Sequence, residues 1–367
     1  MSYLTVREYD ENEALAASLC PNSILEAFAP LHFSVAGYPM RVKSEKELVR
    51  YIDVMHDLSF EEDFANFFSK GLTQEEFELL TQMAVLADKF ALSDFNTRAI
   101  ARPSVLKAIN VLQHVNFLYG ESRPRILEIG PGCGYLGAFL MRESYPYAGM
   151  DVTQAFYLYQ NHFWNYVTDG RLLDFVKAAN PPEVLTGVSA GTPSHLPWWE
   201  FVKLGLKGLP EFDLVICDHA VCEMHWHSLN FLLKTSLACF KRSMGLPKAF
   251  IFQGWGSQRI SSVGDALTRF YNAGYVLIFM DPLLTVFVPS TATYAIDALK
   301  LPNTKGETLP YPYFSLKNPL VQAILKGRAL AQEKRRVDLG TINKFYLELA
   351  GNSNYFTPDE NFLRFVL

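Results

Sequence analysis

The stretch that decides the fold is Arg125-Ile126-Leu127-Glu128-Ile129-Gly130-Pro131-Gly132-Cys133-Gly134. Residues 125–129 form a short apolar run typical of a buried strand, and three alternating glycines follow it. Glycine lets the backbone pass close to a ligand, because no side chain blocks the approach. The apolar segment 135–141 comes next and predicts a helix, whose first N–H groups are free to bind a ligand. The stretch therefore predicts a strand, a ligand-binding loop and a helix.

Two carboxylates flank this loop. Asp151 comes 21 residues after Gly130, at the end of the next predicted strand, where it can accept both hydroxyls of a ribose. Glu128 comes two residues before Gly130. A carboxylate there would repel a pyrophosphate, but it suits the positively charged amino-acid end of S-adenosylmethionine (SAM). The segment 132–137 also fits the GxGxxG fingerprint, so a nicotinamide cofactor is the alternative, and a glycine turn without ligand is a third interpretation.

The order of predicted elements indicates an α/β fold. Strands are expected at 125–129, 147–151, 212–218 and 248–253, with helices at about 154–167, 222–241 and 262–272. This alternation predicts a mostly parallel sheet with helices on both faces, and one further strand near 172–176 or 184–185.

The end of this sheet is expected to reverse direction. Strands predicted at 275–280 and 284–288 are separated by only three residues. A parallel crossover needs about a dozen residues or more, so the pair must form an antiparallel hairpin. A reversed terminal strand is typical of the Rossmann-like sheet of class I methyltransferases.

The flanking regions divide the chain into three expected parts. A helical N-terminal region, 1–119, is expected on the substrate side, with capping boxes at Ser44 and Thr73. The SAM-binding domain is expected at 120–290. A C-terminal extension, 291–367, is expected to act as a lid or a dimer contact and to contain a helix at about 318–336. The basic run 334–336 is typical of a solvated helix end.

Three motifs resemble known families. The segment 126–134 resembles the first motif of class I SAM-dependent methyltransferases. The segments His195-Leu196-Pro197-Trp198-Trp199 and Asp218-His219-Ala220-Val221-Cys222-Glu223-Met224-His225 resemble the sugar O-methyltransferase family of bacteria. The resemblance covers about residues 95–290 and implies SAM as cofactor and a hydroxyl of a sugar or small natural product as acceptor. Asp218 stands where that family more often has Asn.

The expected cofactor contacts lie on the glycine loop and at the ends of the strands beside it. Val152 is expected against the adenine, and the segment 195–199 precedes the fourth strand, where the adenine pocket closes in this fold. Trp198 or Trp199 is expected on adenine or a sugar face, or else in a core corner. The predicted contacts are Glu128, Gly130, Gly132, Gly134, Asp151, Val152, His195, Leu196 and Asp218.

A histidine-rich segment follows the fourth strand, at the place that faces the transferred methyl group. An alcohol is a poor nucleophile until its proton is removed, and a histidine with a pKa near neutrality is a natural general base. His219 is the first candidate and His225 the second, with Glu223 orienting either. The alternatives are a helix cap, an exposed helix face, or a divalent metal held by His219 and Glu223, although no metal-ligand motif is present. Arg98 and Arg102 are candidates for the SAM carboxylate.

Composition disfavours several function classes. The formal net charge is −5, without the basic patch of a nucleic-acid-binding protein. Five cysteines with no CxxC spacing, no leader-like start and no long apolar run indicate a cytoplasmic protein with reduced thiols and no membrane span. The expected partner is a small-molecule acceptor, and a homodimer is possible. The rival hypotheses are amine or carboxyl methylation, a nicotinamide-dependent reductase, and a binding protein without turnover.

Overall fold

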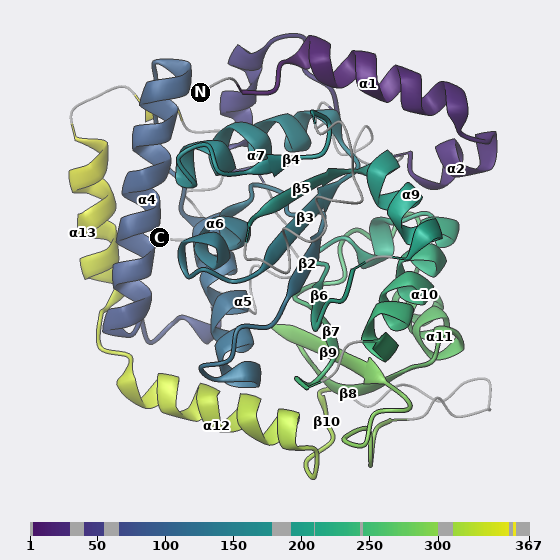
Figure 1. The fold of residues 1–367 in the computed structure, drawn as a ribbon. Coiled ribbons are helices and arrows are strands. Elements are labelled where there is room, and N and C mark those ends of the chain that lie inside the picture. The colour runs from purple at the N-terminus through teal and green to yellow at the C-terminus, as the bar shows by residue number, and fades with distance from the viewer. Residues whose placement is uncertain are drawn as a thin grey trace.

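A nine-stranded sheet runs through the centre of the molecule, with helices on both faces (Figure 1). The computed structural model describes residues 3–29, 40–54, 66–177, 192–208, 210–242, 245–299, 311–351 and 355–356. The strand order is β10-β8-β9-β7-β6-β2-β3-β5-β4. The strands are β2 (Ile126–Ile129), β3 (Tyr147–Asp151), β4 (Leu173–Asp174), β5 (Ser194–Pro197), β6 (Leu214–Ile216), β7 (Ala249–Phe252), β8 (Tyr275–Asp281), β9 (Leu284–Pro289) and β10 (Tyr313–Phe314).

The expected sheet is confirmed, including its reversed end. Strands β2 to β7 pair in parallel, whereas β9 runs antiparallel to both β7 and β8. Strand β4 lies in the first of the two expected places, β5 was not expected, and residues 184–185 lie outside the described residues. Strand β10 adds an unexpected antiparallel edge to β8.

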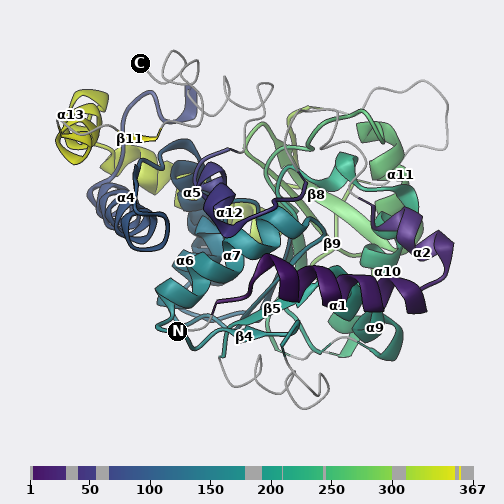
Figure 2. The same cartoon turned by 90° about the horizontal axis from the view of Figure 1, so that it is seen from above.

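Helices on the two faces bury the sheet, as the views in Figures 1 and 2 show. On one face lie α5 (Pro103–Tyr119), α6 (Tyr135–Arg142) and α7 (Gln154–Val167), and on the other α9 (Trp198–Lys207), α10 (Trp226–Arg242) and α11 (Val263–Ala273). Most side chains of the central strands are fully buried, because both faces are covered. The free ends of the parallel strands are therefore the place where a ligand can reach the sheet.

Local signals determine most helix ends. Thr73 and Glu76 form the expected capping box of α4 (Gln74–Phe95), and Gly120 with φ 58° ends α5. The capping box at Ser44 is wrong: Ser44 makes no capping bond, and a 3-10 helix, η1 (Glu45–Tyr51), follows it. The Glu47 carboxylate accepts a hydrogen bond from the backbone N–H of Lys43 instead.

The N-terminal helices lie along the edge of the sheet. Helix α1 (Val6–Leu19) packs on α7 and α9, and α2 (Asn22–Ala27) follows it and packs on α10. The segment before α1 is tied to α7, because the N–H of Leu4 donates to Asn161 Oδ1 at 3.1 Å. This arrangement brings the end of α2 to the carboxyl end of the strands.

The C-terminal extension packs against the N-terminal helices. Helix α12 (Pro319–Lys334) lies on α5, and α13 (Leu339–Ala350) lies on α4. A small parallel pair joins β1 (Arg98–Ala99) to β11 (Tyr355–Phe356). Buried side chains of the N-terminal, central and C-terminal regions form one cluster that includes Leu4, Phe250 and Tyr346. The boundaries at 119 and 290 stay predictions.

The expectation of a solvated basic run is wrong for one of its residues. The side chain of Arg335 is fully buried, where it pairs with Glu76 of α4 at 3.2 Å. The guanidinium lies over the rings of Phe67 and Phe68, with 4.2 Å and 4.5 Å to the ring centroids. The sequence of a basic run does not show its distant partners. Here Arg335 is buried because it pairs with Glu76, which lies far away in the sequence.

Candidate functional site

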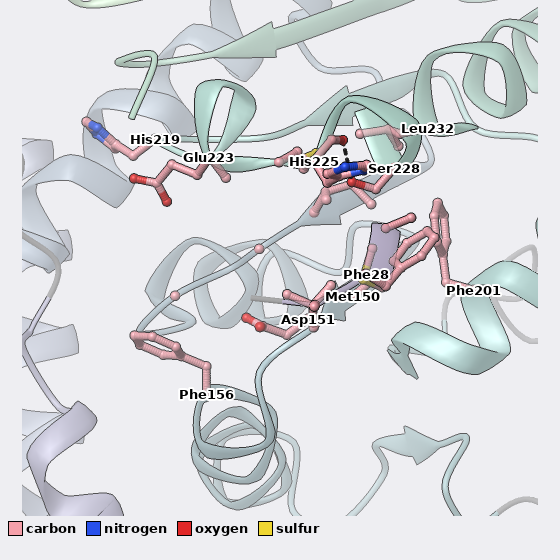
Figure 3. A pocket seen from close by; sticks show the side chains of 18 of the residues that line it. Phe28, Met150, Asp151, Phe156, Phe201, His219, Glu223, His225, Ser228 and Leu232 are labelled. Carbon is pink, nitrogen blue, oxygen red and sulfur yellow. Dashed lines mark hydrogen bonds between the residues drawn. The ribbon is translucent and has the colours of Figure 1, made fainter. Parts of the chain in front are cut away.

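Two adjoining cavities open at the carboxyl ends of β2, β3 and β6. The first cavity, shown in Figure 3, measures about 780 Å³ with its open mouth, and the second about 480 Å³. Gly130, Gly132, Asp218 and His219 line both. The two cavities therefore adjoin along the glycine loop, at the place where the sequence predicts the site.

The glycine loop has the backbone that its sequence predicts. Gly130, Gly132 and Gly134 have φ values of 66°, 56° and 73°, in the left-handed region that favours glycine. A side chain at Gly134 would also collide with the indole of Trp164, whose Nε1 donates to the Gly134 carbonyl at 2.8 Å. The amide of Gln160 donates to the Gly132 carbonyl at 2.8 Å. Buried side chains of α7 thus fix the loop from behind.

Asp151 is held in one orientation at the end of β3. Its Oδ1 accepts bonds from the N–H and hydroxyl of Thr153, at 2.9 Å and 2.8 Å. Its Oδ2 accepts a bond from the Gln160 amide at 2.8 Å. Burial raises the pKa of this carboxyl. Asp151 and Val152 line the first cavity, where Figure 3 shows Asp151 on the edge opposite Glu223.

Two further carboxyls, the buried Glu128 and the partly buried Asp218, face the cavities from the ends of neighbouring strands. The carboxyl of Glu128 lines the second cavity and accepts a bond from the Tyr147 hydroxyl at 2.6 Å. Burial raises the pKa of Glu128 to about 8, and the nearby Asp218 and Asp151 add to the shift. Burial also raises the pKa of Asp218 to about 7, while the N–H of Gln253 donates to its Oδ1 at 2.8 Å. A cationic ligand would stabilise the ionised forms of these groups.

These raised pKa values predict that protein stability and ligand affinity change in opposite directions with pH. Between the unfolded and folded pKa values of Glu128 and Asp218, the folded chain holds more protons than the unfolded chain. The stability of the ligand-free protein should therefore fall as pH rises from about 5 to about 8, because the folded carboxyls must then ionise while buried. Binding of a cation should strengthen over the same range. Thermal unfolding with and without SAM, at several pH values, measures both trends.

The control for this pH prediction is Glu128→Gln, which keeps an oxygen for the Tyr147 hydroxyl to bond. This variant should lose part of the fall in stability with rising pH. S-adenosylhomocysteine (SAH), whose sulfur is uncharged, should show a weaker rise in affinity with pH than SAM. Equal pH slopes for Glu128→Gln and the wild-type protein would contradict the assignment.

The three candidate catalytic residues lie along one rim of the first cavity. His219 and Glu223 lie near each other, and His225 lies farther along the rim towards Ser228 (Figure 3). Burial, and next the neighbouring His227, lower the pKa of His225. His219 has φ 54° and is not helical, so His219 and Glu223 do not lie on one helix face. A 3-10 turn, η2 (Val221–Glu223), brings the two side chains together instead.

Two predicted cofactor contacts lie behind the site. His195 and Leu196 of β5 are fully buried and line neither cavity. The His195 ring stacks on Tyr157 with 3.7 Å between centroids, and its Nε2 lies 3.0 Å from Gln160 Oε1. Because the Gln160 amide also donates to Asp151, His195 is connected to the Asp151 carboxylate through one residue, Gln160. The pKa of His195 lies well below its ordinary value because the ring is buried.

The predicted tryptophans and arginines have structural partners. Trp198 donates its Nε1 to Glu13 at 3.0 Å, and Trp199 packs edge-on against Tyr9 in the core. Arg98 pairs with Asp88 at 2.7 Å, and Arg102 donates to Asn343 at 2.7 Å. Neither arginine lines either of the two cavities, so the structure does not bring them to the place predicted for the SAM carboxylate.

Several lining residues were not predicted from the sequence. Most of those in the first cavity are apolar or aromatic and look like ordinary core positions, and they come together only when α2, α9 and α10 pack around the strand ends. Those of the first cavity are Phe28, Met150, Phe156, Phe201, Met224, Ser228 and Leu232. The second cavity adds Ser104, Lys107 and Gln253.

Within the described ranges, no three side chains of the metal-ligating types gather as a metal site would require. No helix of the described residues is long and apolar enough to cross a membrane.

The comparisons with known proteins concern the fold. No protein-family model matches the chain, and no curated protein matches its sequence. A TehB-like SAM-dependent methyltransferase from Corynebacterium glutamicum is 14% identical, with a TM-score of 0.31 over 50% of this chain and 86% of that chain. Magnesium protoporphyrin IX methyltransferase (ChlM) from Synechocystis PCC 6803 with bound SAH is 11% identical, with a TM-score of 0.32 over 70% of this chain and 96% of that chain.

A third solved structure, PigF with SAH, is 15% identical, with a TM-score of 0.28 over 63% of this chain and 69% of that chain. All three identities and TM-scores are low. The case for function therefore rests on the chain's own site, and the resemblance to bacterial sugar O-methyltransferases stays a prediction.

Proposed function

We propose that this chain is a SAM-dependent methyltransferase that acts on a small molecule. The observation that carries the proposal is a glycine loop surrounded by three carboxyls at the ends of three adjacent strands: Glu128 and Asp151, which are buried, and Asp218, which is partly buried. Unpaired carboxylates buried together are costly, whereas a ligand with positive charge and free hydroxyls stabilises them. SAM has both the positive charge and the free hydroxyls. A dinucleotide would instead place a negatively charged pyrophosphate near the carboxyls of Glu128 and Asp218.

The residues of the two cavities suit the parts of SAM. Asp151 would accept the ribose hydroxyls, and Val152 would pack on the adenine. Glu128 and Asp218 would face the ammonium and the sulfonium. Lys107 is buried in the wall of the second cavity, and its ammonium group would face the carboxylate of SAM. SAM supplies an electrophilic methyl group when bound.

The proposed acceptor is a hydroxyl of a sugar or a small natural product. His219 lines both cavities and would remove the proton of that hydroxyl, while Glu223 would orient the acceptor or the imidazole. Catalysis would otherwise depend on holding the hydroxyl in line with the methyl group. His225 lies farther along the rim and is the second candidate base.

Calorimetric titration of the purified protein with SAM, SAH, NADPH and NADH tests the class of cofactor. We expect saturable one-to-one binding of SAM and SAH and none of the nicotinamides. A response to NADPH alone would replace the proposal with a reductase. No response to SAM or SAH would end it.

The nature of the acceptor is tested with His219→Ala in a product screen that includes hydroxyl and amine acceptors. Loss of general-base assistance should reduce turnover of a hydroxyl acceptor by about 10²–10⁴-fold. An amine needs less help, so a small effect would indicate N-methylation. His227→Ala is the matched control, because His227 is exposed and lines neither cavity. A screen in which SAM binds but no acceptor reacts would favour a binding protein without turnover.

A further inference from the structure

A short loop after β7 holds the segment that carries the candidate catalytic residues. We call residues 254–257, Gly254-Trp255-Gly256-Ser257, the β7 loop. The N–H of Cys222 donates to the Trp255 carbonyl at 2.9 Å, and the N–H of Ser257 donates to Glu223 Oε1 at 2.8 Å. Gln253, just before the loop, accepts the N–H of His219 at 3.0 Å. The backbone of Gln253 and of the β7 loop thus holds residues 219–223 by hydrogen bonds.

Glycine is required at two positions of this loop for steric reasons. A Cβ at Gly254 would collide with Nδ1 and Cε1 of the His219 ring. A Cβ at Gly256 would collide with the His219 carbonyl oxygen and approach Glu223 Cγ to 2.8 Å. Both glycines also have left-handed φ values, 63° and 78°. The imidazole of His219 therefore lies directly against the backbone of Gly254, where a side chain would not fit.

The loop is anchored to the interior at its first end. The side chain of Gln253 is buried, where its Oε1 accepts a bond from Asn110 Nδ2 at 2.9 Å and its Nε2 donates to the Lys107 carbonyl at 3.2 Å. The ring of Trp255 packs edge-on against Phe252, with 4.7 Å between centroids. The loop therefore has little freedom to move away from an added side chain.

The left-handed backbone of His219 agrees with this arrangement. A non-glycine residue in that region carries a conformational cost and persists only where its surroundings hold it. At His219 the surroundings are Gln253 and the two glycines of the β7 loop. We infer that Gly254 and Gly256 are positioning residues, which set the direction of the His219 imidazole and the Glu223 carboxylate at the cavity. The inference rests on the proposed function.

The experiment measures SAH affinity by calorimetry in Gly254→Ala, His219→Ala and the double variant. In Gly254→Ala the imidazole must leave the loop, and the cavities that it lines offer it space, so a ring that enters them should lower SAH affinity about tenfold or more. In the double variant the ring is gone, so SAH affinity should return to that of His219→Ala. This return is the non-additive result expected of two groups in contact.

Gly245→Ala is the matched control. Gly245 also has a left-handed φ, 99°, but among the described residues no atom beyond its chain neighbours lies within 4 Å of a Cβ placed there. This variant carries the same kind of backbone strain without the collision, and its SAH affinity should equal that of the wild-type protein. Thermal unfolding of all four variants shows whether each is folded at the temperature of titration.

Two results would overturn the inference. One is wild-type SAH affinity in Gly254→Ala, which would mean that the ring is not constrained by the loop. The other is a loss in Gly254→Ala that removal of the His219 ring does not restore, which would mean a general loop defect. Failure of the wild-type protein to bind SAH is a different outcome, and it would contradict the proposed function itself.

Discussion

Replacing Asp151 with alanine is expected to reduce SAM affinity roughly a hundredfold or more. Two hydrogen bonds from ribose hydroxyls to a carboxylate each contribute about 1.5–3 kcal/mol, and about 1.4 kcal/mol corresponds to a tenfold change in affinity. Thr153 and Gln160 hold the Asp151 carboxylate in one orientation at the end of β3, so the full contribution of both bonds is expected. Calorimetry with SAM measures the loss directly.

Asp174 provides the matched control for Asp151. It is also a buried aspartate at the end of a strand, and it accepts bonds from Tyr157 at 2.8 Å and Asn161 at 3.0 Å. Asp174 does not line either cavity. Asp174→Ala should therefore destabilise the fold but keep SAM affinity. If both variants bind SAM equally well at a temperature where both are folded, Asp151 is not a cofactor ligand.

SAM should also stabilise the Asp151→Ala variant far less than the wild-type protein. A ligand at 100 times its Kd stabilises the folded protein by about 2.7 kcal/mol, whereas after a hundredfold loss of affinity the same concentration equals the Kd and the gain is about 0.4 kcal/mol. The shift in thermal midpoint on adding SAM should accordingly persist in Asp174→Ala and nearly disappear in Asp151→Ala. This comparison separates loss of binding from loss of folding.

Replacing Arg335 with methionine is expected to destabilise the protein by about 3–5 kcal/mol, the cost of leaving a buried charge without its partner. Arg335 and Glu76 are both fully buried as side chains, and the guanidinium lies over Phe67 and Phe68. Methionine fills part of the volume but supplies neither charge nor hydrogen bonds. Urea unfolding followed by circular dichroism measures the change in the free energy of unfolding.

Arg336→Met is the control, because Arg336 is adjacent, carries the same charge and is exposed. Its effect should stay within about 0.5 kcal/mol, as for most surface substitutions. Adding Glu76→Gln to Arg335→Met should recover part of the loss, since the carboxylate left unpaired is then neutral. Equal destabilisation by Arg335→Met and Arg336→Met would show that the buried pair contributes nothing particular.

Local sequence patterns predicted the parts of the fold that local chemistry decides. The glycines at 130, 132 and 134 require left-handed backbone, the three residues between the last two strands are too few for a crossover, and Thr73 with Glu76 caps a helix. The same patterns misjudged His195, which looks like a pocket residue in sequence and lies behind the pocket. Strand alternation shows which face a side chain takes, but whether that face meets a cavity depends on the helices that cover it.

The sequence by itself determined the central element of this protein: a strand, a glycine loop and a carboxylate on the following strand, whose spacing follows from backbone geometry alone. Only the tertiary structure decided the walls of the two cavities, the contact between His219 and the β7 loop, and the burial of Arg335. These features join segments that are far apart along the chain, such as Phe28 with Leu232 and Glu76 with Arg335. Their energies come from burial and close packing, which depend on the folded surroundings rather than on neighbouring residues.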